Sequence, residues 1–174
     1  MKKFFLICLA VFLSLANCQK KEEPKVQTPF PAGPVQTQNE IGLLQDAVRN
    51  DPKNLNAWIN LGNVMMDTSR FDKAIDAYQH ALELDPENVD VRVDMGTCYR
   101  NIGRPDRAAE EFRKAIKINP RHLYAHRNLG VVLAFDIGDK KQAVKEFEEY
   151  LGLSPNAHDA QQVRQEIAKL KTSK

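Results

Sequence analysis

The sequence contains little of what several common protein classes require. Its 174 residues include three cysteines and one tryptophan, and the formal net charge is only +2. Three cysteines, a small and odd number, do not make a disulfide scaffold. A nearly neutral chain argues against a nucleic-acid-binding protein, which normally shows a basic stripe. We therefore expect neither a disulfide framework nor a nucleic-acid partner.

Motifs for catalysis and cofactor binding are also scarce. The chain has no C-x-x-C pair, no C-x-x-C-H haem-attachment motif and no glycine-rich phosphate loop. His122 and His126 are four residues apart, a spacing that presents two metal ligands on one helix face, but no third ligand accompanies them. We expect these histidines to pack or to face solvent, and we expect no cofactor, no metal and no enzymatic activity. A metalloenzyme that uses this pair is the alternative.

Long apolar runs are missing, and the one apolar run that is present is short. Residues 4–15 are apolar except for Cys8 and Ser14, and they follow Lys2 and Lys3. A helix needs about 20 apolar residues to span a membrane, so this run of 12 is too short for a permanent anchor. A basic start followed by such a run is typical of a secretory signal peptide. We expect residues 1–17 to be a signal peptide and the chain to be exported.

The signal peptide ends at a motif with a modification site. Residues 15–18, Leu-Ala-Asn-Cys, resemble the lipobox of bacterial lipoproteins. The resemblance implies that the thiol of Cys18 receives a diacylglycerol and that Cys18 becomes the new N-terminus. Asn17 departs from the family pattern, in which Gly, Ala or Ser is usual, and cleavage after Ala16 would instead give a soluble secreted protein. Gln19 after the cysteine favours an outer-membrane anchor in the bacterial cell envelope, facing the periplasm.

Residues 18–38 have the composition of a linker. The stretch after Cys18, QKKEEPKVQTPFPAGPVQTQ, holds four of the nine prolines and almost no aliphatic side chains. Such a segment cannot bury enough apolar area to offset the entropy of ordering it. We expect a lipid-anchored, proline-rich linker, which at about 3.1 Å per residue reaches roughly 60 Å from the membrane.

The remainder of the chain repeats with a period of 34 residues. Glycines, prolines and aromatic residues recur at this spacing, with one extra residue between Leu133 and Ile137. The recurring residues are Gly62, Gly96 and Gly130; Pro52, Pro86, Pro120 and Pro155; and Tyr78, Phe112 and Phe147. This pattern, with Trp58 and Leu61 before the first glycine, resembles the tetratricopeptide repeat (TPR).

The resemblance implies an all-α fold, a right-handed α-solenoid of antiparallel helix pairs. We assign TPR repeats to residues 55–88, 89–122 and 123–156, because apolar residues there recur at helical steps. Residues 39–54 match the second half of a repeat and predict a lone N-terminal helix. Residues 157–174 predict a capping helix and tail, which cover the last apolar face. We expect eight helices and no sheet.

Two kinds of repeat residue have predicted packing roles. Gly62 and its two equivalents lie inside predicted helices, where glycine costs about 1 kcal/mol relative to alanine, so we expect a neighbouring helix to approach them closely. Cys98 aligns with Val64 and Val132, and we expect it to be a small buried hydrophobe.

In the TPR family, the first helices of successive repeats line a concave groove that binds a segment of a partner protein. The positions carried over to this chain are Asn56, Ile59, Asn60, Asn63, Met66, Asp90, Val93, Asp94, Thr97, Arg100, Tyr124, Arg127, Asn128 and Val131. Asparagine both donates and accepts hydrogen bonds, so it suits the backbone of an extended peptide. The alternative is that these asparagines are common repeat residues on a solvated face. Ile59, Asp94 and Tyr124 occupy three positions at which some TPR proteins clamp a C-terminal carboxylate, so we expect no such clamp.

The sequence thus predicts a periplasmic lipoprotein that acts as a protein-binding adaptor or scaffold in envelope or secretion-complex assembly. Its partners would be another protein, bound as an extended peptide or helix, and the membrane through Cys18. The alternative is a soluble exported chaperone-like module for cytochrome or pilus biogenesis. Partner identity, pathway and oligomeric state do not follow from the residues.

Overall fold

The computed structural model describes residues 34–172. These residues belong to one compact unit, residues 33–174. The predicted signal peptide, Cys18 and most of the predicted linker lie outside the described residues.

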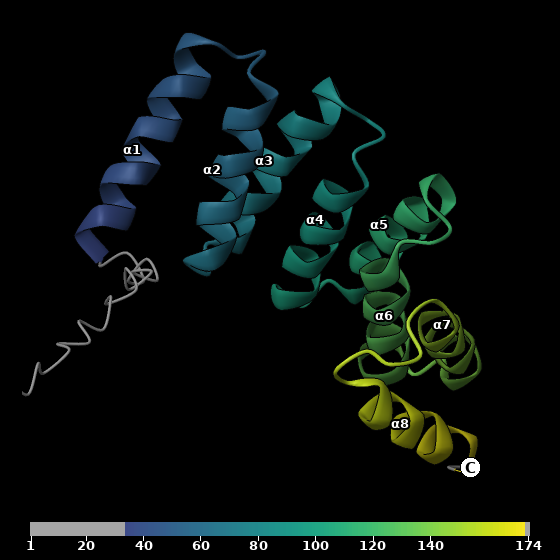
Figure 1. Ribbon diagram of the computed structural model, residues 1–174. Coiled ribbons are helices and arrows are strands. Elements are labelled where there is room, and N and C mark those ends of the chain that lie inside the picture. Colours follow the sequence, from purple (N-terminus) through teal and green to yellow (C-terminus); the bar gives the residue numbers. More distant parts are fainter. Residues whose placement is uncertain (1–33, 173–174) are drawn as a thin grey trace, which may run out of the picture. The chain divides into compact units, whose positions relative to one another are not determined.

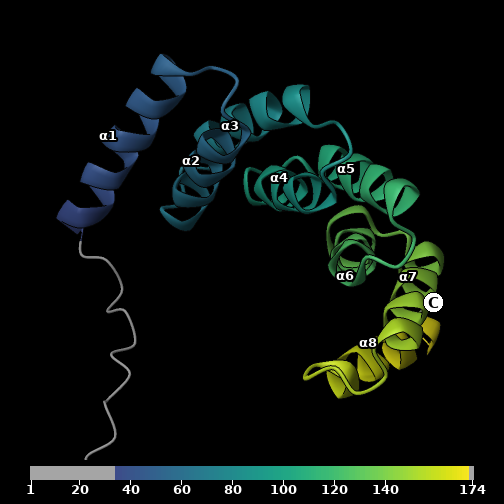
Figure 2. The same cartoon turned by 45° about the horizontal axis from the view of Figure 1, so that its top comes forward.

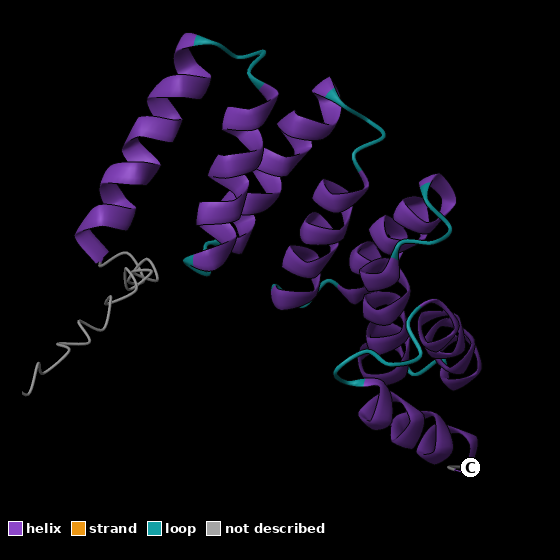
Figure 3. Cartoon of the chain, viewed as in Figure 1, coloured by secondary structure: helices purple, strands orange, loops and turns teal. Residues whose placement is uncertain are grey.

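Within residues 34–172 the chain forms eight α-helices, one π-helix and no strand. In Figure 3 this part of the chain is drawn as helices joined by loops. The helices are α1 (Pro34–Asn50), α2 (Leu55–Asp67), α3 (Phe71–Leu84), α4 (Val89–Asn101), α5 (Pro105–Ile118), α6 (Leu123–Val132), the π-helix η1 (Leu133–Ile137), α7 (Lys140–Leu153) and α8 (Ala160–Thr172). The predicted all-α solenoid is confirmed.

The helices pack in pairs that follow the 34-residue period. The pairs α2–α3, α4–α5 and α6–α7 form the three repeats, α1 packs on α2, and α8 packs on α7. Within this unit, α2, α4 and α6 follow one another along the inner side of a curve, with α3, α5 and α7 on the outer side (Figures 1 and 2). The first helices also contact one another directly, α2 with α4 and α4 with α6. They therefore form one continuous inner face.

The two terminal helices differ from the predicted boundaries. Helix α1 begins at Pro34, so residues 34–38 are helical, whereas the sequence predicted that they belong to the linker. Proline is tolerated in a first turn because its missing N–H would have no partner there. Ile41 and Val48 on α1 are buried in the core, and this apolar face holds the helix on the array. Helix α8 begins at Ala160, three residues after the predicted capping segment begins.

The glycines inside the first helices make room for aromatic rings of the second helices. A Cβ atom at these glycines would lie 2.3–2.6 Å from ring carbons of residues that are themselves buried. The pairs are Gly62 with Tyr78, Gly96 with Phe112, and Gly130 with Phe147. The predicted close approach is confirmed, and the approaching group is an aromatic side chain.

The extra residue of the third repeat is absorbed inside a helix. It produces the π-helix η1, in which the N–H of Gly138 donates to the carbonyl of Leu133 at 2.9 Å. Gly138 ends this turn with φ +89°, and Gly103 ends the corresponding turn of the second repeat with φ +73°. Glycine adopts this left-handed conformation without steric cost. In the first repeat the same position holds Ser69, with φ +58°.

Two sets of polar side chains fix the turns between repeats. Asn54, Asn88 and His122 each cap a first helix by accepting a hydrogen bond from the N–H three residues later, at 3.0–3.1 Å. Four residues later in each repeat, Trp58, Arg92 and His126 donate to the carbonyls of Pro52, Pro86 and Pro120, at 2.9, 2.7 and 3.0 Å. The tryptophan position of the motif therefore clamps the preceding proline turn.

Candidate functional site

The predicted groove residues lie on α2, α4 and α6, along the inner face. Asn56, Asn60, Asp90, Arg100 and Tyr124 are exposed, and Ile59, Asn63, Met66, Asp94, Thr97, Arg127, Asn128 and Val131 are half-buried. Thirteen of the fourteen side chains therefore reach the surface at least in part.

Val93 does not reach the surface, and its assignment to the groove is wrong. Its side chain is 5% exposed and belongs to a core cluster that includes Phe112 of α5 and Leu129 of α6. The equivalent positions hold Ile59 and Arg127, whose longer side chains extend out of the core. The short β-branched side chain of Val93 stays within it.

Several predicted groove residues have partners inside the fold. Asn63 accepts a hydrogen bond from the Tyr78 hydroxyl at 2.8 Å. Arg100 donates to Asp136 of η1 at 2.5 Å, and Arg127 donates to Asp159 at 2.5 Å. These three side chains hold the inner face together. Asn56, Asn60, Asp94 and Tyr124 have no such bond with any residue between 34 and 172.

Three aspartates form an acidic region on α2 and α4. Asp67, Asp90 and Asp94 lie close enough that the first two raise the pKa of the third. Burial raises that pKa most, the charges of Asp90 and Asp67 add to it, and His122 opposes it, so that the pKa of Asp94 is about 6. His122 accepts the Ala125 N–H through Nδ1, so its proton is on Nε2, which donates to Asp90 at 2.9 Å. No described cation pairs with Asp67 or Asp94.

A small hollow lies where α6 and η1 face α8. Its volume is about 90 Å³, and it is lined by Arg127, Val131, Phe135, Phe147, Asp159, Gln162, Val163 and Glu166. Phe135 is 57% exposed and Tyr124 is 56% exposed, although both are large apolar side chains. The inner face therefore offers two exposed aromatic rings and a recess.

The groove positions carried over from the TPR family did not include Phe135 or the α8 residues that line this hollow. The signal for Phe135 was the extra residue between Leu133 and Ile137, because π-helical turns arise from such insertions and occur often at functional sites. Gln162 and Glu166 belong to a helix for which the sequence indicated only a capping role.

A buried carboxylate fixes α8 against α6 and α7. Asp159 is 7% exposed, precedes α8, and accepts hydrogen bonds from the Tyr150 hydroxyl and from Arg127. Burial acts to raise the pKa of Asp159, but the bonds from Tyr150 and Arg127 outweigh it, and the pKa lies below its usual value. Burial and the same carboxylate raise the pKa of Tyr150 to about 12. Asp159 is thus a fixed anion that forms one wall of the hollow.

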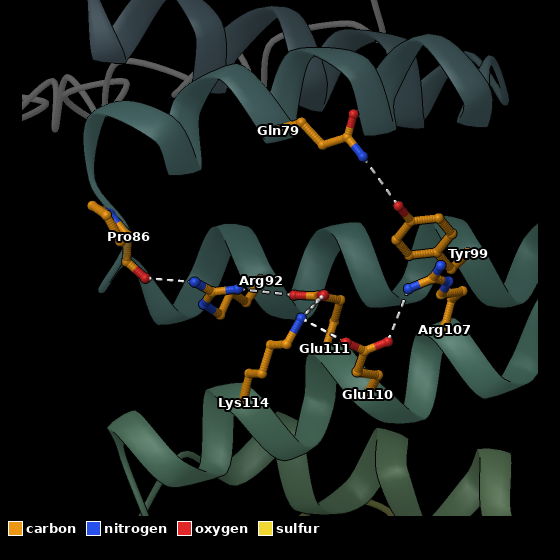
Figure 4. A network of polar contacts seen from close by, with 8 residues as sticks. All are labelled: Gln79, Pro86, Arg92, Tyr99, Arg107, Glu110, Glu111 and Lys114. Carbon is orange, nitrogen blue, oxygen red and sulfur yellow. Dashed lines mark hydrogen bonds and ion pairs between the residues drawn. The ribbon is translucent and has the colours of Figure 1, made fainter.

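A second polar network joins α3, α4 and α5, as Figure 4 shows. Arg92 donates to Glu111 at 2.9 Å, and Lys114 donates to the same carboxylate at 2.8 Å. Gln79 donates to the Tyr99 hydroxyl at 3.2 Å. The hydrogen bonds that Lys114 donates to Glu111 and Glu110 raise its pKa above the usual value. Because its charged side chains already pair with one another, this network serves packing between repeats.

The side chains that could take part in catalysis, two histidines and one cysteine, are buried or already hydrogen-bonded within the fold. His126 is buried, with Nδ1 2.7 Å from Glu146 and Nε2 donating to Pro120, while His122 caps α6. No group of three or more His, Cys, Asp or Glu residues between 34 and 172 could hold a metal ion. Cys98 is buried, as expected, and burial together with Asp94 raises the pKa of its thiol to about 12.

Among the described helices, none has the length and apolar character needed to cross a membrane.

Comparison with known proteins relates this geometry to a family. Residues 36–162 match the family model described as the TPR domain of cytochrome c-type biogenesis protein H. No curated protein sequence gives a significant match. Among solved structures, the crystal structure of MamA is similar, with a TM-score of 0.69 and 20% identity over 78% of this chain and 85% of that chain.

Two further solved structures share the architecture. The first TPR of Spaghetti (RPAP3), bound to the HSP90 peptide SRMEEVD, has a TM-score of 0.65 and 23% identity over 71% of this chain and 97% of that chain. The Sgt2 TPR domain from Aspergillus fumigatus has a TM-score of 0.61 and 27% identity over 67% of this chain and 76% of that chain. The predicted resemblance to TPR proteins is confirmed. The chain is a protein-binding TPR module and belongs to the family of the cytochrome c-type biogenesis protein H TPR domain.

Proposed function

We propose that this protein is a lipid-anchored adaptor of the bacterial envelope that holds a segment of another protein in its inner groove. One observation carries the proposal: Phe135, which lines a recess, and Tyr124 are both exposed on the helices that form the binding face of TPR modules. Exposed aromatic side chains next to a pocket are typical of the residues that dominate binding energy. The adaptor acts by raising local concentration.

The family match supports a process for this adaptor. Its description names cytochrome c-type biogenesis, so we propose that the bound segment belongs to a c-type cytochrome precursor or to a protein that matures one. The alternative is a soluble exported protein without the lipid anchor. Its groove would bind the same kind of segment, and the protein would act as a chaperone-like module.

The anchor and location are supported by the sequence. Cys18 in the lipobox-like motif, followed by a proline-rich segment, suits a lipoprotein held at the outer membrane and facing the periplasm. In metabolic labelling with palmitate, the wild type should incorporate label and Cys18→Ala should not. An unlabelled wild type would leave the soluble exported protein as the better proposal.

We further propose that the protein is not an enzyme. The Cys98 thiol is protonated at neutral pH, and both histidines of the spaced pair already have partners in the fold. Neither group is free to attack a substrate or to transfer a proton to one.

The adaptor function is tested by capture from the native envelope. The wild type, the double variant Tyr124→Ala with Phe135→Ala, and the control Leu43→Ala are compared. Leu43 is an exposed apolar residue on α1, 72% exposed, so its loss removes similar surface outside the groove. We expect the wild type and the control to retain the same protein and the double variant to lose it. Equal retention by all three would show that binding uses another surface.

A further inference from the structure

We propose that the segment bound in the groove carries an aliphatic side chain and, three to five residues away, a lysine or arginine. This inference rests on the proposed function and specifies the chemistry of the partner. The aliphatic side chain fills the hollow between α6–η1 and α8, and the cation lies against Asp67 and Asp94.

The size and walls of the hollow select an aliphatic side chain. Its volume, about 90 Å³, is smaller than the roughly 150 Å³ of a cavity that holds benzene, so an aliphatic side chain fills it better than an aromatic ring. Val131, Phe135 and Val163 provide apolar walls. Gln162 adds a polar group to the lining that can hydrogen-bond to the backbone of an incoming segment, whereas Glu166 is already paired with Lys169 at 2.7 Å. Closing the recess would also cover the ring of Phe135, which is 57% exposed.

The charges of the inner face select a cation. Arg100 and Arg127 are already paired with Asp136 and Asp159. Within the described residues, Asp67 and Asp94 have no ion pair, and Asp90 accepts only a hydrogen bond from His122. The region around Asp94 therefore carries uncompensated negative charge.

The state of Asp94 agrees with this charge balance. Its half-buried carboxyl has a pKa raised to about 6, first by burial and then by Asp90 and Asp67. A lysine or arginine placed beside it would favour the ionised form and relieve the repulsion.

The distance between the two positions follows from helix geometry. Helices α4 and α6 contact each other directly, and packed helices lie about 8–10 Å apart. Asn128 on α6 is equivalent to Asp94, and Val131 and Phe135 follow it by roughly 5–10 Å along the axis at 1.5 Å per residue. The two positions are thus on the order of 10–15 Å apart, which an extended chain at about 3.3 Å per residue covers in three to five residues.

The same charges exclude an acidic segment. The peptide bound by the Spaghetti TPR, SRMEEVD, contains three acidic residues. A segment of that kind would place like charge beside Asp67, Asp90 and Asp94. The chemistry selected by this groove therefore differs from that of its structural relative.

Selection from a displayed library of random 12-residue peptides, with the purified full chain as bait, tests the inference. We expect enriched peptides to carry Leu, Ile or Val with Lys or Arg three to five residues away. Enriched peptides without a basic residue, or with acidic residues in its place, would overturn the inference and leave the proposed peptide-binding function intact. A library without any enriched peptide would contradict both.

Matched variants then assign the two positions, with binding of one enriched peptide measured by fluorescence anisotropy. Asp94→Asn should weaken binding about tenfold and reduce its salt dependence, whereas Asp76→Asn, which removes an exposed charge from α3, should not change it. Phe135→Ala should weaken binding about tenfold, and Leu43→Ala should not. Unchanged affinity for both Asp94→Asn and Phe135→Ala would overturn the inference.

Discussion

The ring of Tyr78 lies so close to the backbone of Gly62 that a Cβ atom on the glycine would be 2.3 Å from Cε1 of the ring. The same contact recurs in the second and third repeats with a phenylalanine ring. In each repeat, an aromatic ring of the second helix therefore fills the space that a side chain at the glycine of the first helix would occupy. This contact packs the two helices together.

This contact predicts a large cost for one methyl group. Gly62→Ala should destabilise the protein by about 1–3 kcal/mol, because the ring is fully buried and has no space to move into. The control is Gly42→Ala on α1, where an added Cβ meets no atom within 4 Å. That change should stabilise the helix by up to ~1 kcal/mol. Urea denaturation measures the free energy of unfolding of both variants. Equal changes in the two would refute the role of Gly62 in packing against Tyr78.

The turn at Ser69 predicts a stabilising substitution. Ser69 has φ +58°, whereas the equivalent turns end in Gly103 and Gly138. Ser69→Gly should therefore raise the free energy of unfolding by about 1 kcal/mol, because it removes the steric cost of the left-handed conformation. Ser154→Gly, at φ −142°, is the matched control and should lower stability slightly. A loss of stability in Ser69→Gly would contradict the expectation.

The clamp at the tryptophan position predicts a structural role for His126. His126→Phe removes the bond to the Pro120 carbonyl and leaves Glu146 without its partner, so stability should fall by about 1–3 kcal/mol. His158→Phe changes an exposed histidine and should have little effect. Thermal unfolding followed by circular dichroism compares them. If both variants melt alike, the clamp does not stabilise the turn.

The network around Asp159 predicts an acid-dependent loss of stability. Asp159→Asn should cost about 2–4 kcal/mol at pH 7, because it leaves the half-buried guanidinium of Arg127 without its anion. The pKa of Asp159 is lowered in the folded protein, so its contribution is complete above the unfolded value of about 4 and disappears as pH falls through the folded value. In urea denaturation at several pH values, the free energies of unfolding of the wild type and of Asp159→Asn should converge below about pH 4. A constant difference would refute the ionic role.

Asp94 predicts the opposite pH dependence. Its pKa is raised to about 6 in the folded protein, by burial, Asp90 and Asp67 against His122, so the ionised form opposes folding. That penalty is absent below about pH 4 and complete above about pH 6. Asp94→Asn should therefore stabilise the protein by about 1–2 kcal/mol at pH 7.5 and hardly at all at pH 4. Urea denaturation at both pH values measures this difference. If Asp94→Asn is less stable than the wild type at pH 7.5, ionised Asp94 does not oppose folding.

The fold was predictable from sequence because its determinants are periodic. The glycines inside the first helices, the aromatic residues that face them and the proline turns recur at 34 or 35 residues, so one repeat predicts the next. The start of α1 was not predictable in this way, because Pro34 and the polar residues after it resemble the linker. There the buried face of Ile41 and Val48 determines the structure.

The candidate site was predictable only in part. Helical position placed Asn60 and Tyr124 on the inner face, but it did not show that Asn63 and Arg127 bond to Tyr78 and Asp159. Those partners come from other helices and depend on tertiary packing. The hollow at Phe135 likewise requires the π-helical turn and the placement of α8, neither of which the repeat pattern specifies.

The central claim, that the inner face binds a protein segment, is tested most directly by photocrosslinking in the native host. A photoreactive amino acid replaces Asn128 on the inner face or Asp76 on the outer helix α3. We expect a discrete crosslinked partner from position 128, weakened by Phe135→Ala, and none from position 76. Crosslinks from position 76 alone, or a crosslink from position 128 that Phe135→Ala leaves unchanged, would contradict it.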